Sequence, residues 1–345
     1  MELARSYFER SAAIDGQATV LGHLVQTGIF LRDTSLLRRA WPVLDRTEDA
    51  PKWMFGWLAA ATTGDAALLA SLRQRPVHAA SDPSALQGAY AAYGAVVPAR
   101  LLDEMFERWI GAIGDDGPRS LVQAARGFAL AGLGRPAAAE RVWAGLPAAA
   151  AVGADEARLV LALAGDGAGL DTEGALRRMA TAGAGSGPEA ERAACLAELW
   201  RRVQGDSARA DAGRFRQSQA RCARALDAVA LGFSRAPDAD SALAAVDSIV
   251  YNASATTSAE LFEGLALAHA WERRGNARRA AAAVRYGIAT DPGRRMDGRL
   301  SALAGDTVTA VYAYRRWLAL TAEAEPAVQA ARESVRAELD RLTGQ

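Results

Sequence analysis

The chain has 345 residues, half of them apolar, and its forty basic residues balance its forty acidic residues. A net charge of zero gives no summed field to hold a polyanion, so nucleic acid is not expected as a partner. No stretch reaches the roughly 18 uncharged apolar residues of a membrane helix. The charged N-terminal residues are not followed by an apolar run, so they do not have the pattern of a secretory signal. We therefore expect a soluble, cytoplasmic chain without membrane insertion; the alternative is the periplasmic part of a membrane-anchored parent.

Alanine-rich runs such as RRAAAAVRYG indicate an all-α protein, because alanine has the highest helix propensity and lets helices approach closely. The first residues, MELARSYFERSAAID, have the pattern of an amphipathic helix with Leu3, Tyr7, Phe8 and Ile14 on one stripe. A single helix cannot bury such a stripe alone. The pattern therefore predicts a partner helix that the preceding sequence does not supply.

Turn signals recur along the chain at a regular spacing. Four turn glycines are 70, 71 and 70 residues apart, each interval holds one weaker break near its middle, and a further turn follows thirty residues later. Halving the interval gives a helix-turn-helix unit of about 35 residues. The glycines are Gly64, Gly134, Gly205 and Gly275, followed by Gly305.

One segment, ELFEGLALAHAWERRGNARRAAAAVRYGIATDPG, shows the unit most clearly. Leu267 and Trp271 lie in its first helix, Gly275 makes the turn, and Ala280 is a small residue where two helices would meet. Pro292 ends the unit, since proline cannot continue a helix. In these features the segment resembles the tetratricopeptide repeat, a unit of about 34 residues.

The resemblance implies a right-handed superhelix of roughly eighteen antiparallel helices, in which each helix pair contacts mainly its neighbours. Residues 18–324 would form the array. Residues 1–17 would be an orphan second helix of a truncated repeat, with Ala4 and Phe8 at the small and aromatic positions. Residues 325–345 would form a capping helix with one apolar stripe. The chain thus looks like the later part of a longer bacterial regulatory protein.

Family geometry also places side chains on the concave wall. His269, Glu272 and Arg273 of the clearest unit would face it, and so would Arg192 and Arg202 near Gly205. A groove with charged and apolar side chains is suited to a partner segment, whose carboxylates the arginines would bind. Trp53 and Trp57 are one helical turn apart and form a second candidate contact surface if they are exposed.

Few sequence features indicate catalysis or the binding of a cofactor or metal. The glycine-rich stretches GDGAGL and GAGSGP lack the Lys-Ser/Thr of a phosphate loop, so no cofactor is expected. His269 and Glu272 could bind a metal weakly, but a metal site needs three or four ligands, and none is expected. Cys195 and Cys222 have no CxxC partner, so we expect free thiols in a reducing compartment rather than a disulfide.

We therefore predict a non-catalytic module for protein interaction or sensing, with a protein or peptide partner. The alternative is an all-α glycan-binding protein or hydrolase. It would use Trp53, Trp57 or Trp109 together with Glu104 and Glu107. Two facing carboxylates in a closed pocket would favour that alternative, and an open groove would favour the first.

Overall fold

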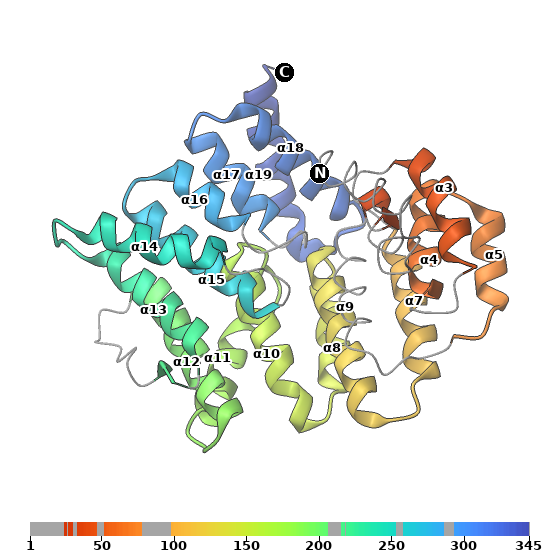
Figure 1. Ribbon diagram of the computed structural model, residues 1–345, viewed down its shortest axis with the longest axis horizontal. Helices are drawn as coiled ribbons and strands as arrows, with labels where there is room; N and C mark the ends of the chain where they lie inside the picture. Colours follow the sequence, from red (N-terminus) through yellow and green to blue (C-terminus); the bar gives the residue numbers. More distant parts are fainter. Residues whose placement is uncertain are drawn as a thin grey trace. The chain divides into compact units, whose positions relative to one another are not determined.

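A computed structural model describes residues 24–25, 27–29, 33–46, 52–77, 98–205, 215–217, 219–252, 258–285 and 293–344 (Figure 1). These residues form α-helices joined by turns and contain no strand, which confirms the all-α prediction. The chain divides into two compact units, residues 1–129 and 130–345. The predicted orphan helix at residues 1–17 lies outside the described residues.

The helices are labelled as in Figure 1. The described helices that begin in the first unit are α3 (Thr34–Leu44), α4 (Lys52–Thr63), α5 (Ala66–Gln74), α7 (Ala99–Ala112) and α8 (Asp116–Gly132). The second unit contains α9 (Pro136–Ala144), α10 (Ala148–Leu163), α11 (Thr172–Ala182), α12 (Pro188–Val203), α13 (Ala220–Phe233), α14 (Ala239–Asn252), α15 (Ser258–Arg273), α16 (Ala277–Val284), α17 (Arg294–Leu303), α18 (Thr307–Leu320) and α19 (Pro326–Thr343).

The predicted turns are present. All five turn glycines have a positive φ, from 69° at Gly64 to 100° at Gly205, a conformation that glycine adopts without steric cost. At Gly275 the next residue, Asn276, caps α16 by accepting a hydrogen bond from the backbone N–H of Arg279 at 3.1 Å. Local turn chemistry therefore ends a helix at each of these five positions.

Large side chains at the predicted core positions are buried: Trp41, Trp143, Trp271 and Trp317. Sequence-adjacent helices pack in pairs, such as α10 with α11 and α17 with α18. In addition, α13 packs along α15, where a Cβ atom on Gly232 would lie only 2.8 Å from the Cα atom of Ala270. Glycine is needed there because the two backbones come so close.

The C-terminal helix α19 covers α18 with its apolar stripe. Val328 and Val335 form a buried cluster with Tyr314 and Trp317. The buried Arg332 donates hydrogen bonds to the backbone oxygens of residues 318 and 321, at the carbonyl end of α18. The positive charge thus lies at the negative end of the α18 dipole, where it is favourable.

Distant segments of the second unit also contact one another, which departs from the expectation that helix pairs contact mainly their neighbours. The Glu325 carboxylate accepts hydrogen bonds from the backbone N–H groups of Ala137 at 2.6 Å and Ala138 at 3.2 Å. These are free N–H groups at the start of α9, whose own N-cap residue makes no side-chain hydrogen bond. A residue 188 positions away therefore caps α9.

A second long-range contact joins the turn after α10 to α18. The Trp317 indole N–H donates to the Asp166 carboxylate at 2.9 Å, and Arg295 of α17 donates to the carbonyl of Gly165 at 2.9 Å. Together with the Glu325 cap, these contacts hold α17, α18 and α19 against the α9–α11 segment. Residues 130–345 therefore form one closed unit.

The prediction of free thiols was wrong. Cys195 of α12 and Cys222 of α13 form a disulfide with an S–S distance of 2.12 Å, and both residues are buried. The sequence did not reveal it because the two cysteines are 27 residues apart and meet only when α12 packs against α13.

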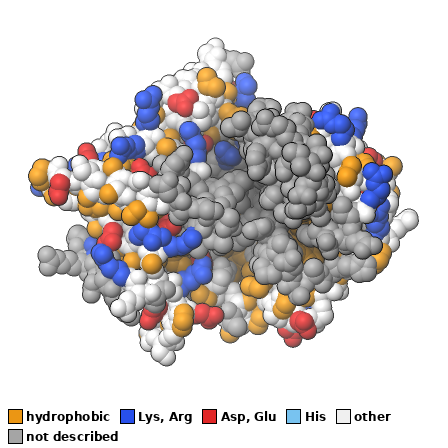
Figure 2. All heavy atoms as spheres, viewed as in Figure 1, with side chains coloured by type: hydrophobic (Ala, Val, Ile, Leu, Met, Phe, Trp, Pro, Cys, Tyr) orange, Lys and Arg blue, Asp and Glu red, His pale blue; other side chains and the backbone are white. Residues whose placement is uncertain are grey.

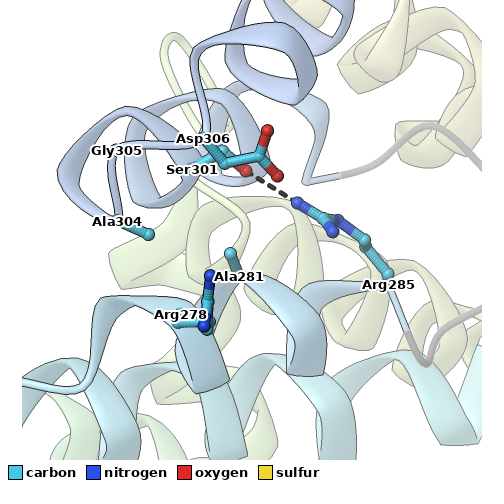
Figure 3. Close-up of a pocket in the computed structure, with 7 residues that line it drawn as sticks. All are labelled: Arg278, Ala281, Arg285, Ser301, Ala304, Gly305 and Asp306. Carbon is cyan, nitrogen blue, oxygen red and sulfur yellow. Dashed lines mark hydrogen bonds between the residues drawn. The ribbon is translucent and has the colours of Figure 1, made fainter.

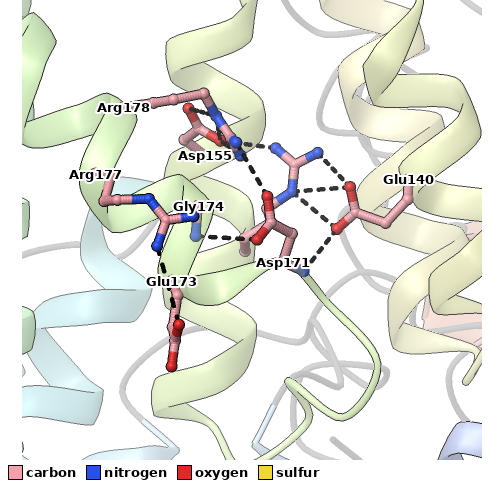
Figure 4. A network of polar contacts seen from close by, with 8 residues as sticks. Glu140, Asp155, Asp171, Glu173, Gly174, Arg177 and Arg178 are labelled. Atoms are coloured by element: carbon pink, nitrogen blue, oxygen red, sulfur yellow. Dashed lines mark hydrogen bonds and ion pairs between the residues drawn. The ribbon is translucent and has the colours of Figure 1, made fainter.

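Figure 4 shows a network of ion pairs between α9, α10 and α11. Asp155, which is buried, accepts hydrogen bonds from Arg158 at 2.8 Å and from Arg178 at 2.7 Å. Arg158 also pairs with Glu140, and Arg178 with Asp171. The Asp171 side chain caps α11, so the network fixes three helices relative to one another.

Candidate functional site

Trp53 and Trp57 do not form an exposed pair. Trp57 has no accessible surface, and its indole N–H donates to the carbonyl of Leu101 at 2.8 Å. The Trp53 indole donates to the carbonyl of Leu72 at 3.0 Å, and the two ring centroids are 5.1 Å apart. The pair thus joins α4 to α5 and α7 inside the first unit, and only part of Trp53 reaches the surface.

The carboxylates proposed for a hydrolase are each bound to an arginine. Glu104 pairs with Arg73 at 2.7 Å, and this contact holds the pKa of Glu104 below its usual value. Glu107 pairs with Arg126 at 2.8 Å, while Trp109 is buried. A general acid needs a raised pKa, so this arrangement gives no support to acid catalysis.

Two of the predicted groove arginines make intramolecular ion pairs. Arg192 of α12 pairs with Glu156 of α10 at 2.6 Å. Arg202 pairs with Glu198 one turn earlier on the same helix at 3.1 Å. The first pair joins α12 to α10 and the second lies within α12, and a partner would have to compete for both arginines.

Arg273 is exposed at the end of α15. Its guanidinium lies 3.9 Å from the centroid of the Phe233 ring, which is 44% exposed, and it donates to the carbonyl of Val203 at 2.6 Å. This stack joins the ends of α12, α13 and α15. It presents an aromatic ring and a cation together at the surface.

His269 and Glu272 lie one turn apart on α15 but bind different partners. The His269 Nε2–H donates to the carbonyl of Leu163 at 2.9 Å, and burial lowers the pKa of the imidazole, which keeps it neutral at pH 7. Glu272 makes a bidentate ion pair with Arg299 of α17, and this contact lowers the pKa of Glu272. In the described part of the chain no group of three or more His, Cys, Asp or Glu residues could hold a metal.

Beside His269 is a cavity of about 260 Å³, formed by the end of α10 together with α15, α17, α18 and α19. Leu163, Met296 and Val335 provide apolar wall. Six polar side chains line the rest: His269, Arg295, Arg299, Tyr314, Ser334 and Glu338. Of these, only His269 was a candidate from the sequence. The others come from helices that are distant from α10 in the chain, so no local motif marks them.

Burial raises the pKa of one group that lines this cavity, Tyr314, and of Asp166, which follows the lining residue Gly165. The phenol of Tyr314 is desolvated and lies near the Glu338 carboxylate, and together these raise the pKa of Tyr314 to about 12. Asp166 retains some accessible surface, but its carboxylate is desolvated where it binds the Trp317 indole, and this raises the pKa of Asp166 to about 6. The nearby Arg295 charge offsets part of that increase.

A second hollow, of about 280 Å³, lies between α16, α17 and the turn that begins α18 (Figure 3). Arg278 and Arg285 line one side, and Asp306 lies on the other (Figure 3). Arg285 is held by Asp297 at 2.8 Å and by the Ser301 hydroxyl at 2.7 Å. Besides its polar groups this hollow is lined only by two alanines and a glycine, so it offers no large apolar or aromatic side chain to a ligand and is a poorer candidate than the first.

No known protein family, curated protein or solved structure matches the chain. Membership of the tetratricopeptide family therefore remains a prediction from the sequence. Among the described residues, no helix is both long enough and apolar enough to span a lipid bilayer.

Proposed function

We propose that the chain is a non-catalytic interaction and sensor module of tetratricopeptide-like repeats, part of a larger bacterial regulatory protein. The observation that carries the proposal is the Arg273–Phe233 stack. Arginine and aromatic residues are enriched at protein interfaces, and an exposed pair held in one geometry loses little side-chain entropy on binding.

The chemistry of the stack favours an extended partner segment with carboxylates and apolar side chains. Figure 2 shows basic side chains gathered over the region of α13 and α15. The exposed Phe233 ring would take an apolar residue of the partner, and Arg273 a carboxylate beside it. Among the described residues of the first unit, the tryptophans give less support to the glycan-binding alternative, because Trp57 and Trp109 are buried.

The disulfide is informative about the cellular compartment of the module. Disulfides persist in oxidising compartments and are rare in the cytoplasm, so a buried Cys195–Cys222 bond favours the periplasmic alternative over a cytoplasmic location. A periplasmic array attached to a membrane-anchored parent would suit a sensor.

Site-specific photocrosslinking tests the interaction. A photoreactive phenylalanine analogue at position 233, in the protein expressed in its own organism, should give an adduct with one partner. The same analogue at Tyr312, which is also exposed but lies on α18, should not capture that protein. With the partner then purified, we expect Arg273→Glu to weaken binding about tenfold or more and the exposed Arg315→Glu to leave it unchanged. Equal binding by Arg273→Glu and the unmodified protein would remove the stack from the interface.

A further inference from the structure

Each charged side chain that lines the cavity beside His269 has a group of opposite charge close to it. Arg299 is paired with Glu272, Arg295 is close to Asp166, and Glu338 pairs with Arg341 of the same helix. A ligand with a net charge would leave one of these groups unbalanced in a partly desolvated site. The cavity therefore favours a ligand whose own charges sum to zero.

The charges are also separated across the cavity. Arg295 and Arg299 are one turn apart on α17 and provide a positive wall, whereas Glu338 on α19 provides a negative one. A ligand without charged groups would gain nothing from this separation. A zwitterion would place one charge on each wall.

Tyr314 provides a second, independent indication of a ligand. Only 3% of this residue is exposed, and none of the described residues hydrogen-bonds its hydroxyl. The hydroxyl is close enough to Arg295, Arg299 and Glu338 to feel their charges, and all of them line the cavity. The hydroxyl oxygen itself is not among the fully buried atoms that lack a partner, so it keeps some accessible surface and can donate a hydrogen bond to a ligand in the cavity.

The volume sets the size of the ligand. A cavity of about 260 Å³ has room for roughly nine water molecules at about 30 Å³ each, which is comparable to the number of non-hydrogen atoms in leucine. Met296 and Val335 supply apolar wall for an aliphatic side chain. Ser334 lies at the exposed rim.

We propose that this cavity binds a small aliphatic α-amino acid, with its carboxylate at Arg295, Arg299 and the Tyr314 hydroxyl and its ammonium group at Glu338. Such a ligand would bridge α17 and α19 beside the end of α10. It would therefore stabilise the closed form of the 130–345 unit, and this goes beyond the binding of a protein partner at Phe233.

Calorimetric titration of the purified full chain with L-leucine tests the proposal, and no protein partner is needed. We expect saturable binding of L-leucine and at least tenfold weaker binding of leucinamide, which lacks the carboxylate, and of N-acetyl-leucine, which lacks the ammonium group. Equal binding of the three compounds, or no binding of any aliphatic amino acid at 10 mM in a thermal-shift series, overturns the proposal.

Two conservative variants locate the site. Tyr314→Phe keeps the buried ring and should weaken L-leucine binding about tenfold, because it removes one hydrogen bond to a charged group. Glu338→Gln should weaken L-leucine binding similarly and leave the weak binding of N-acetyl-leucine unchanged. The exposed Arg315→Gln on α18 is the control and should bind L-leucine normally. Normal binding by both cavity variants would place the amino acid elsewhere and contradict the assignment.

Discussion

Replacing Cys195 and Cys222 by alanine lowers the free energy of unfolding of the second unit by about 3.5 kcal/mol, the value expected for a crosslink that closes a loop of 27 residues. The loss arises mainly in the unfolded chain, which gains conformational freedom when the crosslink is absent. Urea unfolding of the full chain, followed by circular dichroism, measures the change.

The reduced form of the unmodified protein is the matched comparison. A reductant should shift its unfolding midpoint to lower urea by nearly the same amount, and it should have no effect on the double alanine variant. If the unmodified protein contains two alkylatable thiols when purified under oxidising conditions, the disulfide and the compartment inferred from it are both wrong.

Asp155→Ala is expected to destabilise the second unit by about 3 kcal/mol, because it removes the carboxylate that neutralises the buried Arg158. Glu140 remains as a partner for Arg158, so the expected loss is at the lower end of the range for a broken buried pair. Arg178 also loses its best-buried partner. The free energy of unfolding from urea titration measures the effect.

Glu173→Ala is the control for this variant. Glu173 lies on the same helix as Arg178 (Figure 4), but its side chain is 91% exposed and only approaches Arg177 at 3.9 Å. A change within about 0.5 kcal/mol is expected there. Equal effects of the two substitutions would mean that burial of Asp155 adds nothing to the stability of the network.

The parts of the fold that the sequence predicted are those determined by local chemistry. Gly275 and Asn276 make a turn and a cap from neighbouring residues, so their roles can be recognised without knowing what packs against them. The same holds for Trp271, whose helical spacing placed it in the core. The all-α class and the five glycine turns follow from such positions. The regular two-helix period does not hold throughout, because, of the described helices, only α13, α14 and α15 lie between Gly205 and Gly275 and α13 packs against α15.

The features that the sequence did not reveal depend on contacts between distant residues. Glu325 is the residue just before α19, and nothing in the sequence around it indicates a distant contact. Its carboxylate nevertheless caps α9. Family geometry placed Arg192 and Arg202 on a groove wall, but each binds a glutamate within the fold. The cavity at Tyr314 is lined by residues of α10, α15, α17, α18 and α19, which are far apart in the sequence, so no local pattern predicts it.

Backbone hydrogen exchange at the start of α9 tests the closed unit most directly. In Glu325→Ala, the amides of Ala137 and Ala138 should exchange about fivefold faster than in the unmodified protein, because loss of a helix cap costs about 1 kcal/mol. Glu333→Ala, on the exposed side of α19, should leave these amides unchanged. If Glu325→Ala alters exchange only in α18 and α19, the two ends of the 130–345 unit do not meet and the chain is an open array.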